Sequence, residues 1–383
     1  MRILYDDQGF VEHHGGVSRY FTEIMKRLPD GFEYVLPLVS TSNQYLHDAP
    51  FNLPFHKQDI HDFIRDWCHG ICFPGVSRVY RLCARLMPRR FPSGEFANSR
   101  EVRKALKEGN FDVLHPTGPH WIRDDWKIVV GKKPIVITIH DLIPELLYRS
   151  KRTMTSRRQL LEAASHVIAV SENTKRDVIR LYGTPKEKIS VIYHGYLPID
   201  TVIPLRDQPQ DPYVVYVGKR NGYKNFRFLV KAIALLLKNK DLMLFCTGSE
   251  FSLEERSFFD SLGVSHRIIQ RFVRDEEMPA LFKNAVAFVY PSLLEGFGIP
   301  ILDAFSSGCP VILSRTSCFP EVAGNAALYF EKGDAVTLCN HVEALMHDDG
   351  LRQSMIKKGH DRVSMFSWEK CVSESVRVYA NLG

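Results

Sequence analysis

Short apolar runs rich in β-branched residues alternate with amphipathic stretches along this chain of 383 residues, and the alternation occurs twice. In the N-terminal half it predicts strands at 2–6, 111–115, 134–141 and 166–171, and helices at 17–28 and 172–182. Ser171 is a favourable N-cap for the second of these helices, and Gly183 is a favourable C-terminal stop. Buried strands that alternate with helices indicate an α/β fold with a doubly wound parallel sheet.

The second alternation follows residues 198–212, PIDTVIPLRDQPQDP, whose prolines and polar residues are typical of a linker. It predicts strands at 213–218, 242–248, 286–292 and 310–314, and helices at 225–239 and 276–285. Two sheets joined in this way leave a ligand-binding cleft at the carboxyl ends of their strands. The sequence therefore predicts an N-terminal domain at 1–200, a C-terminal domain at 201–365, and a terminal helix at 366–383 that can cross back to the first domain.

Composition excludes several classes of protein, because 45% hydrophobic and 25% charged residues are typical of a globular chain. The start, MRILYDDQGF, carries acids where a signal peptide needs an apolar run, and apolar segments such as 232–237 are too short to span a bilayer. We therefore expect a cytoplasmic protein. Its eight cysteines are scattered, which favours reduced thiols, and CHGIC at 68–72 lacks the second ligand pair of a zinc site. We expect no bound metal.

The net charge is +6, and the stretch 60–110 holds ten Lys and Arg against five Asp and Glu. Within it Arg78, Arg81 and Arg85 lie at helical spacing, with apolar residues on another face. Such a helix can lie on an anionic membrane surface or meet a phosphorylated acceptor, and it can equally be a solvated helix face. We therefore expect peripheral membrane contact through region 65–107 as one alternative. No nucleic-acid-binding module accompanies the charge, so nucleic acid is not an expected partner.

The stretch YPSLLEGFGIPILDAFSSGCPVILS, Tyr290–Ser314, predicts a strand, a turn at EGFG and a helix that begins at Pro300 and stops at Gly308. The amino end of that helix points unpaired N–H groups and the positive end of its dipole at the sheet edge, which favours an anion there. Glu295 precedes the turn, and Asp303 lies in the first turns of the helix. These two acids can hold two sets of hydroxyl groups with a phosphate between them.

Two further turns follow strands. YVGKRNGYKNF, Tyr216–Phe226, places Arg220 and Lys224 after the first strand of the C-terminal domain, where they can clamp a diphosphate. EHHGGVSRY, at 12–20, follows the first strand of the N-terminal domain and contains Gly15 and Gly16. We expect this glycine turn to close on the same anion.

The motifs GGVSRY, TIHDLIPE, AVSENTKRDV, VGKRNGYKN and the Tyr290–Ser314 stretch followed by PEVAGNAALYF occur in this order. Together they resemble glycosyltransferase family 4, the group 1 glycosyl transferases. The likeness runs from residue 1 to about 334 and is strongest from Val214 onward. It implies a retaining enzyme with the GT-B fold: two Rossmann-like domains, with 1–200 binding the acceptor and 201–365 binding a nucleotide sugar.

The resemblance also implies roles for individual residues. Arg220, Lys224, Glu295 and His140 would be catalytic, with His140 beside the reacting carbon and Asp141 on the acceptor side. The implied donor-binding set is Gly15, Gly16, Gly218, Arg220, Lys224, Val273, Glu295, Gly296, Phe297, Gly298, Ile299 and Asp303. Asp303 stands where the E-x7-E motif of the family has its second Glu, so its contact with the ribose hydroxyls has a shorter reach.

The implied reaction moves a hexose from a donor of the GDP-mannose or UDP-glucose type to a saccharide or lipid-linked acceptor, in polysaccharide or glycoconjugate synthesis. No D-x-D triplet occurs in the sequence, so we expect a metal-independent reaction without a cofactor. Two alternatives remain open: a sugar-nucleotide epimerase of similar architecture, and an inactive scaffold that binds a sugar nucleotide or a partner enzyme. An oxidoreductase is disfavoured, because no G-x-G-x-x-G follows a first strand.

Overall fold

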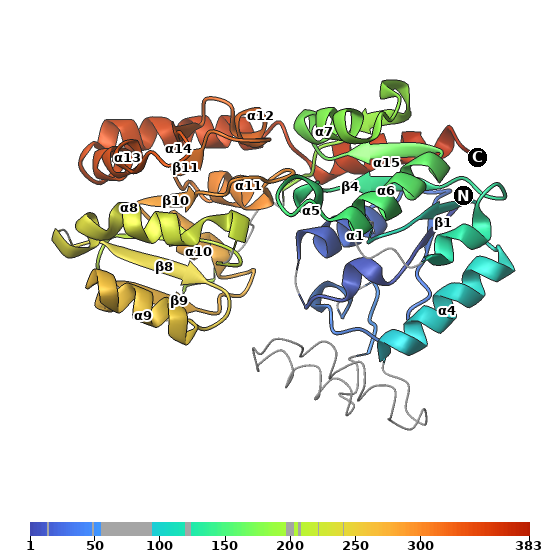
Figure 1. Cartoon of the computed structure of the whole chain (residues 1–383), viewed down its shortest axis with the longest axis horizontal. Coiled ribbons are helices and arrows are strands. Elements are labelled where there is room, and N and C mark those ends of the chain that lie inside the picture. The colour runs from blue at the N-terminus through green and yellow to red at the C-terminus, as the bar shows by residue number, and fades with distance from the viewer. Residues whose placement is uncertain are drawn as a thin grey trace. The chain divides into compact units, whose positions relative to one another are not determined.

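The structure is a computed structural model (Figure 1), and it describes residues 1–13, 15–47, 50–54, 94–118, 124–196, 203–205, 208–220, 222–239 and 241–383. The predicted basic helix with Arg78, Arg81 and Arg85, and the CHGIC segment, lie outside the described residues. The predicted linker at 198–212 is described only in part.

The chain divides into two compact units whose segments are not consecutive. Unit 1 comprises Met1–Thr138, Arg152–Ile168 and Val372–Gly383, and unit 2 comprises Ile139–Lys151 and Ala169–Cys371. These units group segments by their mutual contacts, so the domain boundaries expected from the order of the chain stay a prediction.

The strands are β1 (Arg2–Tyr5), β2 (Glu33–Val35), β3 (Val113–His115), β4 (Val136–Ile139), β5 (His166–Ala169), β6 (Ile189–Val191), β7 (Tyr213–Tyr216), β8 (Met243–Thr247), β9 (Ile268–Arg271), β10 (Ala287–Tyr290), β11 (Val311–Ser314) and β12 (Ala327–Phe330). The α-helices are α1 (Gly16–Lys26), α4 (Gly94–Glu108), α5 (Ile143–Leu146), α6 (Lys151–Ala163), α7 (Glu172–Tyr182), α8 (Phe226–Asn239), α9 (Leu253–Leu262), α10 (Met278–Lys283), α11 (Ile299–Ser306), α12 (Phe319–Ala323), α13 (Ala335–His347), α14 (Asp349–Val363) and α15 (Trp368–Ala380). Short 3-10 helices are η1 (Gln8–Phe10), η2 (Gln44–Leu46), η3 (Asp124–Val129), η4 (Lys186–Lys188), η5 (Gly222–Lys224) and η6 (Ser265–Arg267).

Parallel pairing dominates the strands of unit 1. β1 pairs with β2 on one side and with β3 on the other, both in parallel. A parallel bridge between Leu114 and Ile135 then links β3 to the segment that leads into β4. Another three-stranded sheet has the order β4-β5-β6, and its last strand lies within the range of unit 2. The apolar face of α1, which includes Tyr20, Phe21 and Ile24, is buried, as its amphipathic pattern predicts.

The last helix belongs to unit 1 through its second half. The hydroxyl of Tyr379 on α15 lies 2.7 Å from His115 Nδ1 at the end of β3 and 3.2 Å from the Tyr5 hydroxyl at the end of β1. All three side chains are fully buried. Buried polar groups of this kind are stabilised by their hydrogen bonds, and these bonds attach the helix to the sheet.

Unit 2 contains a six-stranded sheet of order β12-β11-β10-β7-β8-β9, whose neighbouring strands are parallel. The chain moves from β7 outward to β9, crosses back, and then moves from β10 outward to β12. The direction therefore changes between β7 and β10, and open α/β sheets bind ligands at such a switch point. This confirms the predicted doubly wound parallel sheet.

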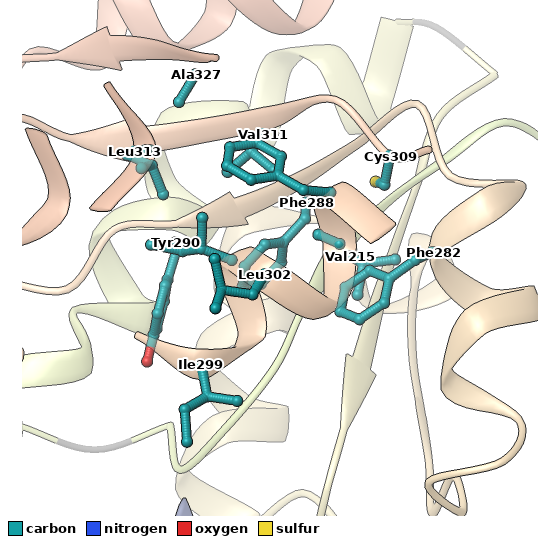
Figure 2. Packing of buried hydrophobic residues seen from close by; sticks show 14 of the residues in the cluster. Val215, Phe282, Phe288, Tyr290, Ile299, Leu302, Cys309, Val311, Leu313 and Ala327 are labelled. Atoms are coloured by element: carbon teal, nitrogen blue, oxygen red, sulfur yellow. The ribbon is translucent and has the colours of Figure 1, made fainter. Parts of the chain in front are cut away.

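Helices cover both faces of this sheet, and the strands supply alternate residues to each face. Tyr213 and Val215 pack in the cluster with α10, α11 and α12, while Val214 and Tyr216 pack with α8, α9 and α13. Figure 2 shows part of the first cluster, with Phe288 and Tyr290 of β10 beside Leu302 of α11. The strands are thus apolar on both faces because both faces are buried.

Local signals set the ends of several helices. Ser171 caps α7 by accepting a hydrogen bond from the Thr174 amide, and Gly183 ends it at φ 68°, both as predicted. α11 begins at Ile299, one residue before the predicted start, so Pro300 is its second residue. Among the helices of the described residues, none combines the length and apolar character that a transmembrane span requires.

Candidate functional site

The candidate site lies at the carboxyl edge of the six-stranded sheet, at the switch point between β7 and β10. The turn after β7 carries Gly218, Arg220 and Lys224, and the loop after β10 carries Glu295. Because β7 and β10 are parallel neighbours, these two loops emerge side by side. Hydrogen bonds to backbone carbonyls help to join them: the Leu293 amide donates to the Tyr223 carbonyl at 2.8 Å, and Asn225 Nδ2 donates to the Pro291 carbonyl.

Lys224 and Glu295, predicted to share the site, form an ion pair with 2.7 Å between Lys224 Nζ and Glu295 Oε1. The Lys224 ammonium also donates to the Tyr290 hydroxyl at 2.8 Å and lies over the rings of Tyr223 and Tyr290. Tyr290 belongs to the core, and Figure 2 shows its hydroxyl oxygen directed away from Leu313 and Ala327. The Lys224 ammonium thus contacts Glu295, Tyr290 and Tyr223 at the edge of the apolar core.

Burial and charge act in opposite directions on the pKa of Lys224. Burial lowers it, but the Glu295 carboxylate and Tyr223 raise it more, and the net pKa lies above the ordinary lysine value. Burial, followed by Glu295, raises the pKa of Tyr290. At neutral pH the site therefore holds a Lys224 ammonium beside a neutral Tyr290 phenol.

Arg220 is held by different partners. Its Nε donates to Glu255 Oε1 at 2.7 Å, and its Nη2 donates to Glu255 Oε2 at 3.4 Å and to the Glu250 carbonyl at 2.8 Å. The guanidinium carbon lies 4.8 Å from the centre of the Phe251 ring. Only 6% of the Arg220 side chain is exposed, so its orientation is fixed before any ligand arrives.

Glycines with left-handed backbones line this edge. Gly218 has φ 118° and Gly248, after β8, has φ 102°, a region that favours glycine. A Cβ on Gly218 would lie 3.9 Å from the Lys224 side chain, and one on Gly248 would lie 4.0 Å from Arg220 Nη1. Each cation therefore lies beside one of these two glycines, Lys224 beside Gly218 and Arg220 beside Gly248.

The EGFG turn lies directly against His140 and Asp141, the two residues that follow β4. A Cβ on Gly296 would lie 1.5 Å from the His140 carbonyl oxygen, so any other residue would force the two segments apart. His140 is buried and stacks on His194, with 5.7 Å between ring centres, and His194 meets the Phe297 ring edge-on at 4.8 Å. The structure thus brings together His140, Gly296 and Phe297, and Asp141 also lies at this contact.

The helix after this turn also follows the prediction. Gly298 caps α11 at φ 92°, and Ile299 is its first residue. Asp303 lies in the second turn and is half-buried. Val273, predicted to contact a base, follows β9 at the same sheet edge and packs against the core. Gly15 and Gly16 stand at the start of α1 in unit 1, and their contact with the same anion stays a prediction.

Sequence reasoning missed Glu255 and His194. Glu255 belongs to a capping box at the start of α9, in which the Ser252 hydroxyl accepts from the Glu255 amide and the Glu255 carboxylate accepts from the Ser252 amide. The S-x-x-E pattern of SLEE is the signal that predicts such a box. No local signal predicts the stacking of His194 on His140. Within the described ranges, no group of three or more His, Cys, Asp or Glu side chains is placed to hold a metal ion.

Comparison with protein families assigns both halves of the chain. Residues 14–197 match the model for Glycosyltransferase Family 4, and residues 204–362 match the model for Glycosyl transferases group 1. The chain belongs to glycosyltransferase family 4. It is a glycosyltransferase, so the family resemblance expected from the motifs is confirmed.

Curated relatives of this family 4 glycosyltransferase carry related names. O-antigen chain mannosyltransferase B of Escherichia coli is 28% identical over 72% of this chain and 81% of its own length. MMP alpha-(1->4)-mannosyltransferase of Mycolicibacterium hassiacum is 22% identical over 99% of this chain and 98% of its own length. These names do not favour the epimerase or the inactive scaffold.

Solved structures confirm the fold of this glycosyltransferase. Anabaena HepE in complex with UDP and glucose covers the whole chain with a TM-score of 0.72 at 18% identity. Sucrose-phosphate synthase from Thermosynechococcus elongatus has a TM-score of 0.69 at 17% identity, covering 100% of this chain and 99% of its own. The predicted GT-B fold with parallel sheets is thereby confirmed.

Proposed function

We propose that this protein is a retaining hexosyltransferase whose donor is a nucleotide diphosphate sugar of the GDP-mannose or UDP-glucose type. The observation that carries the proposal is the Lys224–Glu295 ion pair at the switch point of the six-stranded sheet. A cation and an acid held together there suit a ligand with a diphosphate next to sugar hydroxyls. Relatives named mannosyltransferases, and HepE with UDP and glucose, support the two donor types.

The two cations would act on the leaving group. As the bond between the anomeric carbon and the phosphate oxygen breaks, negative charge grows on the nucleoside diphosphate. Lys224 and Arg220 would stabilise that charge, and the amide groups at the start of α11 would add to it. Because both cations are already fixed by protein partners, they need little reorganisation when the charge develops.

The remaining residues would orient the substrates. Glu295 and the amides of Gly296, Phe297 and Gly298 would bind the sugar hydroxyls, and Asp303 would bind the ribose hydroxyls. The backbone of Val273 would contact the base. His140 would lie beside the reacting carbon, and Asp141 would orient it or the acceptor.

In the retaining mechanism that we propose, the acceptor oxygen bonds to the anomeric carbon on the face that the diphosphate leaves. The acceptor loses its proton to the departing phosphate oxygen, so protons and charges balance without a side-chain base. Glu295 is not the nucleophile in this scheme, and its ion pair with Lys224 favours a binding role. A covalent adduct of donor sugar on Glu295 would contradict this assignment.

For the acceptor, we propose a saccharide or a lipid-linked molecule. We also propose that the reaction takes place in the cytoplasm and that region 65–107 makes peripheral contact with a membrane. The lack of a D-x-D triplet supports a reaction without a divalent ion. Unchanged turnover in excess EDTA is expected, whereas a loss that added Mg²⁺ restores would contradict metal independence.

The test is a panel of UDP-, GDP- and ADP-sugars, mixed with the full-length protein and with extracts that contain acceptor. Release of nucleoside diphosphate that depends on the extract, with the sugar joined through an unchanged anomeric configuration, supports the proposal. Saturable binding without release would indicate a scaffold. Epimerisation or hydrolysis that ignores the extract would indicate an epimerase.

A further inference from the structure

The segment Ser314–Cys318, which begins at the last residue of β11, binds the backbone of the Glu295 loop through its side chains. Thr316 Oγ1 donates to the Leu293 carbonyl at 3.0 Å, and the Ser314 hydroxyl donates to the Ser292 carbonyl. The Ser317 hydroxyl accepts from the Glu295 amide at 3.1 Å. The Cys318 thiol lies 3.3 Å from the carbonyl oxygens of both Glu295 and Phe297. Four side chains of one five-residue segment thus bind one loop.

Ser317 adopts a backbone that its residue type disfavours. Its φ is 44°, in the left-handed region that favours glycine, and the neighbouring hydrogen bonds hold it there. A strained backbone of this kind persists where the surrounding contacts hold the side chain in one position. Here that position is at the amide of Glu295, the residue that meets Lys224.

Cys318 completes the contact from the interior. Its side chain is fully buried, and its thiol faces the two carbonyls that flank Gly296. Burial, followed by the Glu295 carboxylate, raises the pKa of this thiol, so it keeps its proton and can donate at neutral pH. The thiol therefore acts as a hydrogen-bond donor and is not a nucleophile.

We propose that Ser317 and Cys318 are positioning residues, which fix the main chain of Glu295 so that its carboxylate meets Lys224 and the donor sugar. The role rests on the proposed function for its effect on turnover. Neither residue touches the donor in this scheme. Ser317 binds the amide of Glu295 and Cys318 binds its carbonyl, so the peptide groups on both sides of the Glu295 side chain are fixed.

The experiment separates the hydroxyl of Ser317 from its backbone strain. Ser317→Ala removes the hydroxyl and keeps the strain, whereas Ser317→Gly removes both. We expect each variant to lower kcat for nucleoside diphosphate release about tenfold, part of the about 10²-fold that a 1 Å misplacement costs. The melting temperature of Ser317→Gly is expected to exceed that of Ser317→Ala by about 2–4 °C.

A thiol series and a control complete the test. Cys318→Ser keeps a donor and is expected to hold kcat within about threefold, while Cys318→Ala loses about tenfold, as for a misplaced group. Ser261→Ala removes a similar hydroxyl bond, from Ser261 Oγ to the Phe258 carbonyl in α9, and is expected to leave kcat unchanged. Wild-type turnover in Ser317→Gly, or kcat values that simply follow melting temperature, would overturn the positioning role.

Hydrogen exchange tests the contact without any turnover. In the ligand-free protein, peptides that span 293–298 should exchange faster in Ser317→Ala and Ser317→Gly than in the wild type, because the Glu295 amide loses its acceptor. Unchanged exchange would overturn the inference even if the protein is active. If the wild type released no nucleoside diphosphate from any donor, the proposed function would fail, and the exchange data would still decide whether Ser317 holds Glu295.

Discussion

Arg220 and Lys224 stand four residues apart on one turn, yet their surroundings differ. Lys224 pairs with Glu295, an acid from the neighbouring loop that the family resemblance assigns to the donor sugar. Arg220 pairs with Glu255, an acid that also closes the capping box of α9. The first pair joins two predicted functional residues. The second joins a predicted functional residue to a structural one.

This difference indicates how each cation would work. Lys224 would exchange part of its contact with Glu295 for a contact with the diphosphate, so its positive charge would act directly on the leaving group. Arg220 would keep Glu255 and offer its remaining edge, beside Gly248, to the ligand. Lys224 therefore should dominate turnover, while the Arg220–Glu255 pair should affect donor binding and stability.

The largest effect is expected at Lys224. Lys224→Ala should lower turnover by about 10²-fold or more, comparable to the loss of one oxyanion-hole donor. Steady-state assays of nucleoside diphosphate release measure the change. Lys231→Ala on α8 is the control, because this lysine lies over Phe258 and is expected to leave turnover unaltered. A loss under about threefold would contradict the assignment of Lys224 to the clamp.

A smaller effect is expected at Glu255. Glu255→Gln weakens the hold on Arg220, so the KM for the donor should rise about fivefold, roughly the effect of one weakened hydrogen bond of about 1 kcal/mol. Donor titrations measure KM and kcat separately. Glu254→Gln is the matched control, since its pair with Arg227 is more than half exposed on both sides and should contribute little. Equal effects from both variants would contradict the distinction.

The Glu255 carboxylate and the Lys224 ammonium should lose their charges at opposite ends of the pH scale. Burial raises the pKa of Glu255, but its bonds from Arg220 and Ser252 lower it more, and the net pKa is below the ordinary glutamate value. Its stabilisation is therefore complete above about pH 4.3, the unfolded-state pKa, and is lost as pH falls through the lower folded-state pKa. Urea unfolding of the wild type and of Glu255→Gln between pH 3 and 7 measures this effect. The difference between their free energies of unfolding should become smaller as the pH falls.

The Lys224 ammonium follows the reverse rule. Its folded-state pKa is raised, so its stabilisation is complete below about pH 10.4 and is lost only as pH rises through a higher value. Deprotonation of Lys224 should therefore not lower turnover between pH 7 and 9. An alkaline limb in that window that disappears in Lys224→Arg would contradict the raised pKa.

The smallest effect is expected at Asp303. Asp303→Glu restores the residue usual in the family motif, so turnover should stay the same or rise by up to about threefold, the gain from better placement of one hydrogen bond. Assays at low donor concentration would reveal the gain. Asp303→Ala serves as the contrast and should raise the donor KM. Complete loss in Asp303→Glu would mean that this position does not bind ribose.

Much of this fold could be predicted from local pattern. The alternation of buried strands with amphipathic helices specified a parallel α/β sheet, because apolar strands with helical crossovers have few other solutions. Ser171, Gly183 and Gly308 marked helix ends through their own backbone and side-chain preferences. The approach of Lys224 to Glu295 also followed from sequence, since both lie in loops after strands of one parallel sheet.

Other contacts depended on residues distant in the chain. The pairing of Arg220 with Glu255 and the stacking of His140 on His194 join segments that follow different strands. The attachment of Tyr379 to His115 spans 264 residues. Short-range patterns carry no information on such pairs.

By itself, therefore, the sequence determined the class of fold, the parallel sheets and the residues gathered at one sheet edge. The periodicity of apolar residues and the preferences of helix caps are local properties, because each depends on a few adjacent residues. Only the tertiary structure decided which carboxylate holds which cation and which side chains bind the Glu295 loop. Those choices depend on strand order and loop packing, which bring distant residues within hydrogen-bond distance.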